Sequence, residues 1–201
     1  MLYLFFVNDM LKHGEIIINT ESRILVPVKH YQAITGHCKR KLDENYIEGE
    51  SRERKAFGLL GGRENNSGYI VDRCFPLLKN GRHLPPYNQI MDSVLTEYAI
   101  PSETPIAKRG WVAEPGELLE KIKFMQQHNL LLLGTYHMHR VAWPDDPLRD
   151  KPTTLDTVLA TDSEMLIFII SMVKVDQPVL RAFYEGNPDK EVPVIIKDFT
   201  R

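Results

Sequence analysis

The sequence predicts an α/β domain in which a mixed β-sheet is flanked by helices. Three observations support this prediction. The chain has 201 residues, of which 43% are hydrophobic and 26% charged, and this composition is typical of one globular domain with its own core. Short apolar runs typical of buried strands alternate with segments whose apolar residues recur at helical spacing. The resulting order, β-α-β-β-loop-α-β-α-β-β, places helices between strands of one sheet.

The first half of the chain is predicted to contain a strand, a helix and a hairpin. An apolar run predicts a strand over 23–28, and apolar residues at helical spacing predict an amphipathic helix over 30–45. The charged residues 47–55 are expected to form a solvated connection. Two apolar runs joined by an Asn-Asn-Ser-Gly turn predict a β-hairpin over 56–77.

The second half of the chain is predicted to lead from a helix into the strand that carries two histidines. Pro115 is suited to the first turn of a helix, and the apolar face that follows continues to about residue 128. A strand over 130–139 comes directly after it. Shorter elements are expected around it: helices near 90–98 and 153–162, and a pair of buried strands over 165–173 and 179–186.

Charge and apolar patterning exclude several classes of function. A net charge of −2 gives no reason to expect nucleic acid or an anionic membrane as a partner, and no apolar run approaches the roughly 20 residues of a membrane helix. Cys38 and Cys74 form no CxxC pair, and the first residues lack the features of a secretory signal, so a cytoplasmic protein is expected. Residues 1–22 are predicted to be an N-terminal extension that could form a hairpin, and 23–201 a single domain.

His137 and His139 are candidate metal ligands. Residues i and i+2 of a strand point to the same face, so the two imidazoles can converge while Met138 faces away. Imidazole suits zinc, and a carboxylate can supply a third protein ligand, leaving one position open for water. An aspartate-rich loop follows the pair, and loops carried by a rigid strand are common places for functional sites.

Several segments, taken in order, resemble the JAMM (MPN-plus) metalloprotease family. The matches are Gly-Leu-Leu-Gly at 58–61, a segment ending in Asn80, a helix and apolar strand over 116–136, the His-x-His pair, Pro-Thr-x-x-Asp at 152–156 and a closing strand at 180–183. Together they span roughly residues 23–185. The resemblance implies a cytidine-deaminase-like MPN (JAB) fold, with helices flanking a mixed sheet.

The resemblance also implies roles for individual residues. His137 and His139 would bind Zn²⁺. The third ligand has two candidates: Asp150, at the family's usual separation from the second histidine, and Asp156, which ends the Pro-Thr-x-x-Asp match. We favour Asp156, with about six residues inserted in the loop, because loops tolerate insertion at low cost. Thr153, in place of the family's serine, would help to stabilise an oxyanion, or cap the following helix, or do both.

The general base is the main departure from the family. Lys55 stands where the family has a glutamate that takes a proton from the metal-bound water. Glu53 is the preferred substitute, and Glu50 is a second candidate. Trp143, in the loop after the histidines, is either a loop aromatic or a substrate contact.

The implied activity is that of a zinc-dependent metallopeptidase or isopeptidase. Its substrate would be a protein or peptide, such as the C-terminal tail of a ubiquitin-like or sulfur-carrier protein. The alternative, which Lys55 favours, is a catalytically inactive domain that binds metal or a partner protein.

Overall fold

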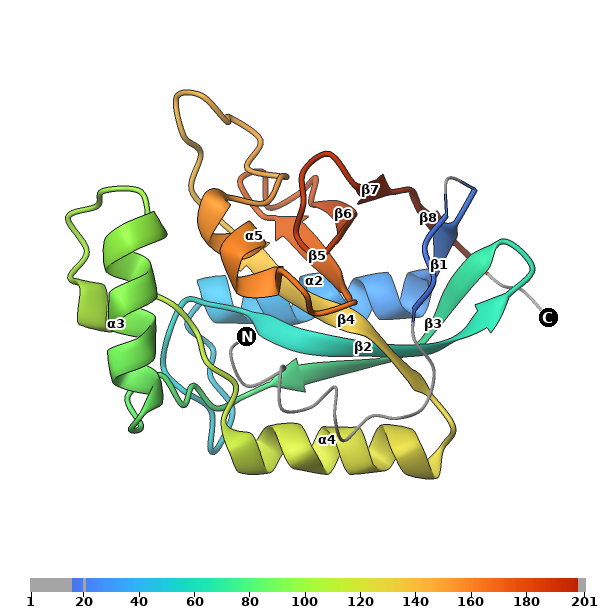
Figure 1. Ribbon diagram of the computed structural model, residues 1–201, viewed down its shortest axis with the longest axis horizontal. Helices are drawn as coiled ribbons and strands as arrows, with labels where there is room; N and C mark the ends of the chain where they lie inside the picture. The colour runs from blue at the N-terminus through green and yellow to red at the C-terminus, as the bar shows by residue number, and fades with distance from the viewer. Residues whose placement is uncertain (1–15, 20, 199–201) are drawn as a thin grey trace.

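The computed structural model describes residues 16–19 and 21–198, which form one eight-stranded mixed sheet and its covering helices (Figure 1). The predicted hairpin over 1–22 lies mostly outside these residues. Within 16–19 the chain has no regular structure, and the Ile17 backbone N–H donates a hydrogen bond to the Tyr69 hydroxyl at 2.8 Å. No helix in the described ranges combines the length and the apolar character needed to cross a membrane.

Most of the predicted elements are present at nearly the predicted places. The strands are β1 (Arg23–Pro27), β2 (Phe57–Asn65), β3 (Gly68–Leu77), β4 (Leu131–His139), β5 (Leu166–Ser171), β6 (Val179–Tyr184), β7 (Glu191–Val192) and β8 (Val194–Lys197). The helices are α2 (Val28–Leu42), α3 (Tyr87–Tyr98), α4 (Pro115–Gln127) and α5 (Thr154–Ala160), with a short 3₁₀ turn, η1 (Ile106–Lys108). The hairpin β2–β3 and the strand pair β5–β6 are confirmed, whereas β7 and β8 were not predicted.

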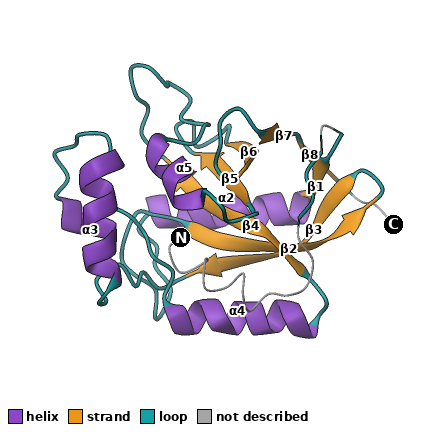
Figure 2. Cartoon of the chain, viewed as in Figure 1, coloured by secondary structure: helices purple, strands orange, loops and turns teal. Residues whose placement is uncertain are grey.

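The predicted architecture, a mixed sheet flanked by helices as in a cytidine-deaminase-like MPN domain, is wrong. The strand order is β7-β6-β5-β4-β2-β3-β1-β8, and the sheet curls until β6 and β8, which lie near its opposite ends, contact each other. The result, within residues 16–19 and 21–198, is a nearly closed, barrel-like mixed sheet with four α-helices (Figure 2).

The curvature arises from features that a hydrophobic period does not reveal. Strand β2 has an irregularity in its register with β3, between Gly61 and Gly62, and another in its register with β4, between Leu60 and Gly61. Such bulges bend a strand and increase its twist. The short C-terminal strands then extend both edges of the sheet, because β7 pairs with β6 and β8 with β1.

Two helices cover opposite faces of the sheet. Ile34 and Cys38 of α2 belong to the main core, together with buried side chains of strands at both ends of the sheet, such as Ile24 and Leu180. Helix α4 packs against the other face, where its apolar side chains meet β2 and β4. Since strand β4 lies between these two layers, its position is fixed from both sides.

The connection over 47–55 is not simply a solvated segment. The Glu50 side chain is fully buried and forms a bidentate ion pair with Arg40 of α2. Its Oε1 also lies 3.5 Å from Nζ of Lys41. This buried carboxylate fastens the connection to α2, and the sequence-based expectation of a solvated run was wrong for this residue.

Candidate metal centre

The two histidines converge at the end of β4. Because His137 and His139 point to the same face of the strand, their Nε2 atoms lie 3.1 Å apart. β4 is hydrogen-bonded to β2 on one side and to β5 on the other, so the backbone that carries both imidazoles is held by two neighbouring strands. His139 is buried and His137 is half-buried.

Asp156 completes the group from the first turn of α5. Its Oδ1 lies 3.2 Å from His137 Nε2, and its Oδ2 lies 3.6 Å from His139 Nε2. Among the residues that the structure describes, these three form a group of potential ligands whose donor atoms lie within 4.8 Å of one another. The structure therefore brings together His137, His139 and Asp156, as predicted.

Thr153 orients the Asp156 carboxylate. The Thr153 backbone N–H and hydroxyl donate to Asp156 Oδ2 at 2.7 and 2.8 Å, and the Thr153 hydroxyl oxygen accepts from the Asp156 N–H at 3.3 Å. This is a capping box at the start of α5, so the helix-capping role is confirmed. For Thr153 to donate to an oxyanion, its hydroxyl would have to leave Asp156.

The backbone carbonyl of Arg149 orients His139. His139 Nδ1 lies 3.0 Å from this oxygen, which can only accept, so Nδ1 carries the proton and the Nε2 lone pair faces His137 and Asp156. The Arg149 guanidinium in turn lies 3.4 Å from the centre of the Trp143 ring. Trp143 thus packs against the residue whose carbonyl orients His139. A direct contact between Trp143 and a substrate stays a prediction.

The donor set fits a divalent cation such as zinc. Bonds of 2.0–2.1 Å in tetrahedral geometry separate neighbouring donor atoms by about 3.3 Å, close to the observed 3.1 to 3.6 Å. Burial lowers the pKa of His139, against the opposing influence of Asp156. Burial would raise the pKa of Asp156, but the adjacent imidazoles outweigh it and hold that pKa well below the usual range. A neutral imidazole and an ionised carboxylate are the forms that bind metals.

An apolar cavity opens beside the ligands. It has a volume of about 160 Å³, and its walls include His137, Asp156, Phe57, Trp111 and Leu155. The Phe57 ring stacks on His137, with ring centres 5.8 Å apart, and on Trp111, with ring centres 6.2 Å apart. A substrate side chain placed here would lie next to the metal ligands.

Glu53 lies in a neighbouring cavity. Its two carboxylate oxygens accept from the Asn80 amide at 2.9 and 3.2 Å, and Oε2 is 2.7 Å from Nζ of Lys55. Lys55 lines both cavities, whereas Glu53 does not line the one that His137 and Asp156 share, as far as the described residues show. Glu50, the other candidate base, is committed to Arg40. The structure therefore does not place a general base beside the ligands.

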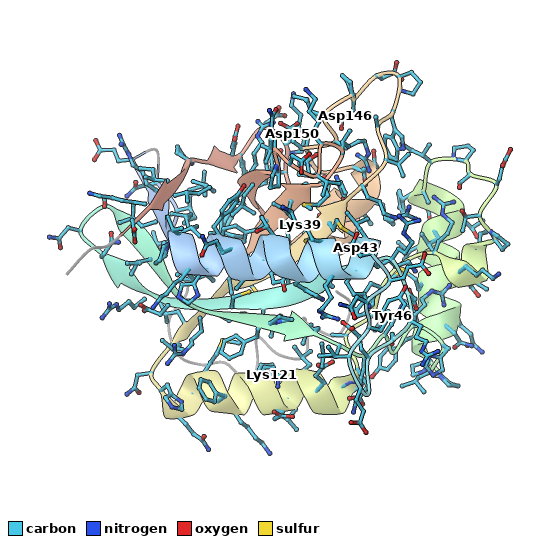
Figure 3. All side chains as sticks on the ribbon, turned by 180° about the vertical axis from the view of Figure 1, so that it is seen from behind. Lys39, Asp43, Tyr46, Lys121, Asp146 and Asp150 are labelled. Atoms are coloured by element: carbon cyan, nitrogen blue, oxygen red, sulfur yellow. The ribbon has the colours of Figure 1, made fainter. Side chains whose placement is uncertain are left out.

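The other aspartates near the histidines in sequence lie in the loop between β4 and α5, and Asp146 and Asp150 are labelled in Figure 3. Asp150, the alternative third ligand, is buried and forms an ion pair with Arg181 at 3.1 Å, so it is not part of the metal group. Asp146 accepts from the Arg149 N–H at 2.8 Å. Asp145 is exposed, as expected for a loop charge.

The roles of three residues in and around the site were not predicted. Arg149 acts through its backbone carbonyl, which has no sequence signal. Phe57 stands near the start of the predicted hairpin over 56–77, but its place beside His137 follows from the pairing of β2 with β4. Asn80 was noted as part of a resemblance, but its role as the residue that orients Glu53 depends on folding.

Comparisons with known proteins show a shared fold and no family. No protein-family model matches the chain, and no curated protein is significantly similar to it. Among solved structures, protein DSY2949 from Desulfitobacterium hafniense is 23% identical, with a TM-score of 0.57, and the match covers 89% of this chain and 95% of that one. A protein from Salinibacter ruber is 19% identical, with a TM-score of 0.44, over 87% of this chain and 91% of that one.

The likeness to the Desulfitobacterium hafniense protein concerns the fold alone. It extends over nearly the whole of both chains, and it agrees with the strongly curved sheet described above rather than with the predicted helix-flanked sheet.

Proposed function

We propose that this protein is a zinc-dependent hydrolase of peptide or isopeptide bonds, with His137, His139 and Asp156 as the metal ligands. The observation that carries the proposal is the convergence of two imidazole nitrogens and one carboxylate, 3.1 to 3.6 Å apart, at the mouth of a cavity. Three protein ligands leave a coordination position for water, as catalytic zinc sites require. The ordered motif matches to JAMM metalloproteases favour the same chemistry, although the predicted architecture does not apply.

Other residues of the chain would bind the substrate and move the proton during hydrolysis. Zinc held by His137, His139 and Asp156 would supply an acidified water and polarise the scissile carbonyl. The cavity beside His137 would hold an apolar side chain of the substrate, and Thr153 would keep Asp156 aligned. Glu53 would accept the proton from the water after releasing Lys55. A third of the Glu53 side chain is exposed, and it lies in a segment without regular structure, so rotation about its side-chain bonds is open to it.

The proposed substrate is a flexible peptide segment, such as the C-terminal tail of a ubiquitin-like or sulfur-carrier protein. We place this activity in the cytoplasm, because both cysteines are free within the protein and fit a reducing compartment.

A second candidate function is metal binding without hydrolysis, in a domain that recognises another protein. The observation that favours it is the 2.7 Å ion pair between Lys55 and Glu53, which occupies the candidate base and places a cation on the wall of the ligand cavity. A lysine in its usual charged state cannot accept a proton from water.

Metal analysis tests the feature that both candidates share. We expect the purified protein to bind about one zinc per chain, and the His137→Ala/His139→Ala double variant to bind none. His128→Ala is the matched control, because His128 ends α4 and stacks on Phe124, outside the metal group. Equal zinc contents in the wild type and the double variant would refute both candidates.

Cleavage assays separate the two candidates. On fusions of a ubiquitin-like protein to a reporter, a hydrolase should release the reporter, and Glu53→Gln should slow release by about 10²-fold or more, as expected for loss of a general base. Zinc content should be unchanged in Glu53→Gln. Zinc binding without cleavage of any peptide or isopeptide substrate would favour the recognition domain.

A further inference from the structure

A second cavity adjoins the candidate metal centre, and its walls are strongly basic. It has a volume of about 410 Å³, and five cationic side chains line it: Arg54, Lys55, Arg82, Lys108 and Arg140. Glu53 is its one carboxylate among the residues described. The whole chain has a net charge of −2, so this local excess of positive charge is not a property of the protein in general.

Part of this positive charge is neutralised within the protein. Arg82 is buried and pairs with Asp92, and it also donates to the backbone carbonyls of Asn88 and Arg109. Lys55 pairs with Glu53, while its ammonium also donates to the carbonyls of Lys108 and Gly110 at 2.8 and 3.0 Å. These contacts fix two of the cations in position.

Two other cations remain available. For the side chains of Lys108 and Arg140, both exposed, the described part of the chain provides no hydrogen bond or ion pair. They come from η1 and from the residue directly after His139, so separate segments of the fold direct them to one cavity. A cleft lined by one sign of charge concentrates ligands of the opposite sign.

The two cavities meet at Lys55. The walls of one include His137, Asp156 and apolar side chains, the other contains the excess of cations, and Lys55 lines both. An extended peptide advances about 3.3 Å per residue, so residues a few positions apart in one substrate can occupy neighbouring cavities. The pair of cavities therefore has the layout of a groove with an apolar and a cationic subsite.

We infer that the substrate segment is an acidic peptide, with an apolar residue in the cavity beside His137 and aspartate or glutamate side chains in the basic cavity. This inference rests on the proposed function, because it names the substrate class of the same site. A peptide fits better than a phosphate-rich ligand, because the basic cavity adjoins one with apolar walls that include Phe57 and Trp111, and a peptide can carry acidic and apolar side chains together.

Binding of labelled peptides to the full-length protein tests the inference. The probes are three fluorescein-labelled peptides of twelve residues, each with a central leucine followed by three glutamates, three glutamines or three lysines. In fluorescence anisotropy at low salt, we expect the glutamate peptide to bind about five- to tenfold more tightly than the glutamine peptide, as two or three partly exposed ion pairs allow. The lysine peptide should bind most weakly, and added salt should reduce the preference.

Variants connect the preference to the cavity. The Lys108→Gln/Arg140→Gln double variant should lose most of the preference for the glutamate peptide. Lys39→Gln/Lys174→Gln is the matched control, because both lysines lie outside the two cavities. Equal binding of the glutamate and glutamine peptides would overturn the inference, as would an unchanged preference in the double variant or tighter binding of a twelve-nucleotide RNA.

The acidic-peptide inference and the proposed hydrolase activity can be tested independently of each other. Binding is also measured with the His137→Ala/His139→Ala variant, in which any contribution of a metal is removed. A preference for the glutamate peptide without cleavage would uphold the acidic ligand and refute the hydrolase. Cleavage whose rate is the same for the glutamate and glutamine peptides would uphold the hydrolase and refute the acidic ligand.

Discussion

Glu50→Gln should destabilise the protein strongly. The Glu50 carboxylate is fully buried and holds the Arg40 guanidinium through two hydrogen bonds, and it lies 3.5 Å from the ammonium of Lys41. The Lys41 side chain is itself only 1% exposed. Removing one partner of a buried ion pair typically costs about 3–5 kcal/mol, because the other charge stays buried without compensation.

The lower end of that range is expected here. The Arg40 side chain is 22% exposed, so water can partly solvate its charge, and a glutamine can still accept the hydrogen bond that the Ile47 N–H donates to Glu50. We therefore expect a loss of about 3 kcal/mol in the free energy of unfolding, measured by urea denaturation followed by circular dichroism.

Glu48→Gln is the matched control for this experiment. Glu48 lies two residues away in the same connection and is exposed, so its substitution should change stability by less than about 0.5 kcal/mol. If Glu50→Gln cost less than about 1 kcal/mol, or no more than Glu48→Gln, then the buried carboxylate would not be what fastens residues 47–55 to α2.

Three further predictions concern pH, packing and metal affinity. Burial, with Arg40 nearby, lowers the pKa of His37 from 6.5 to about 4, so between these pH values the unfolded chain binds a proton that the folded chain does not. The free energy of unfolding should therefore fall by up to about 3 kcal/mol as the pH falls from 6.5 to 4. In urea titrations at several pH values, His37→Gln should reduce this dependence on pH. Gly134→Ala should lower the free energy of unfolding by about 3 kcal/mol or more, because the new Cβ would lie 1.8 Å from the Leu166 carbonyl oxygen of β5. Gly36→Ala, with open space around the site in α2, should raise it by about 0.5–1 kcal/mol. Similar urea midpoints for the two variants would contradict this prediction. Asp156→Asn should weaken zinc binding at least tenfold, measured by calorimetry. Helix α5 should persist in circular dichroism, because the amide oxygen can still accept a hydrogen bond from the Thr153 N–H at the start of the helix. Unchanged zinc affinity would exclude the Asp156 carboxylate as a ligand.

The hydrophobic periods of the sequence predict the elements but not the curvature of the sheet. Leu118, Ile122 and Met125 share one face of α4, and their spacing along the chain is enough to identify the helix. The bend of β2 depends on bulges at Gly61 and its neighbours, where strand register shifts against two partners. A register shift is a property of paired strands, so a single strand's pattern does not contain it.

The sequence likewise predicts some residues of the candidate site and not others. His137 and His139 were predictable because alternation along one strand dictates that they share a face. Asp156 was selected by its Thr-x-x-Asp context, and that context is the capping box that orients the carboxylate. The Arg149 carbonyl, in contrast, reaches His139 through the path of a ten-residue loop, and such a path follows from tertiary contacts such as the Trp143–Arg149 stack.

The pairing of Lys55 with Glu53 connects the question of catalysis to that of substrate charge. In the structure, the Lys55 ammonium is the nearest charge to the candidate base, at 2.7 Å, and it stands on the wall shared by the two cavities. An acidic side chain arriving in the basic cavity would compete with Glu53 for that ammonium, because both carboxylates offer the same kind of charge-assisted hydrogen bond. Binding of an acidic substrate would then weaken the hold of Lys55 on Glu53, and the Glu53 carboxylate would have only its hydrogen bonds with the Asn80 amide to exchange when it turns toward the metal ligands. On this reasoning the acidic peptide should raise kcat as well as lower KM relative to the glutamine peptide, and Lys55→Ala should remove the effect on kcat while leaving the contribution of Lys108 and Arg140 to KM.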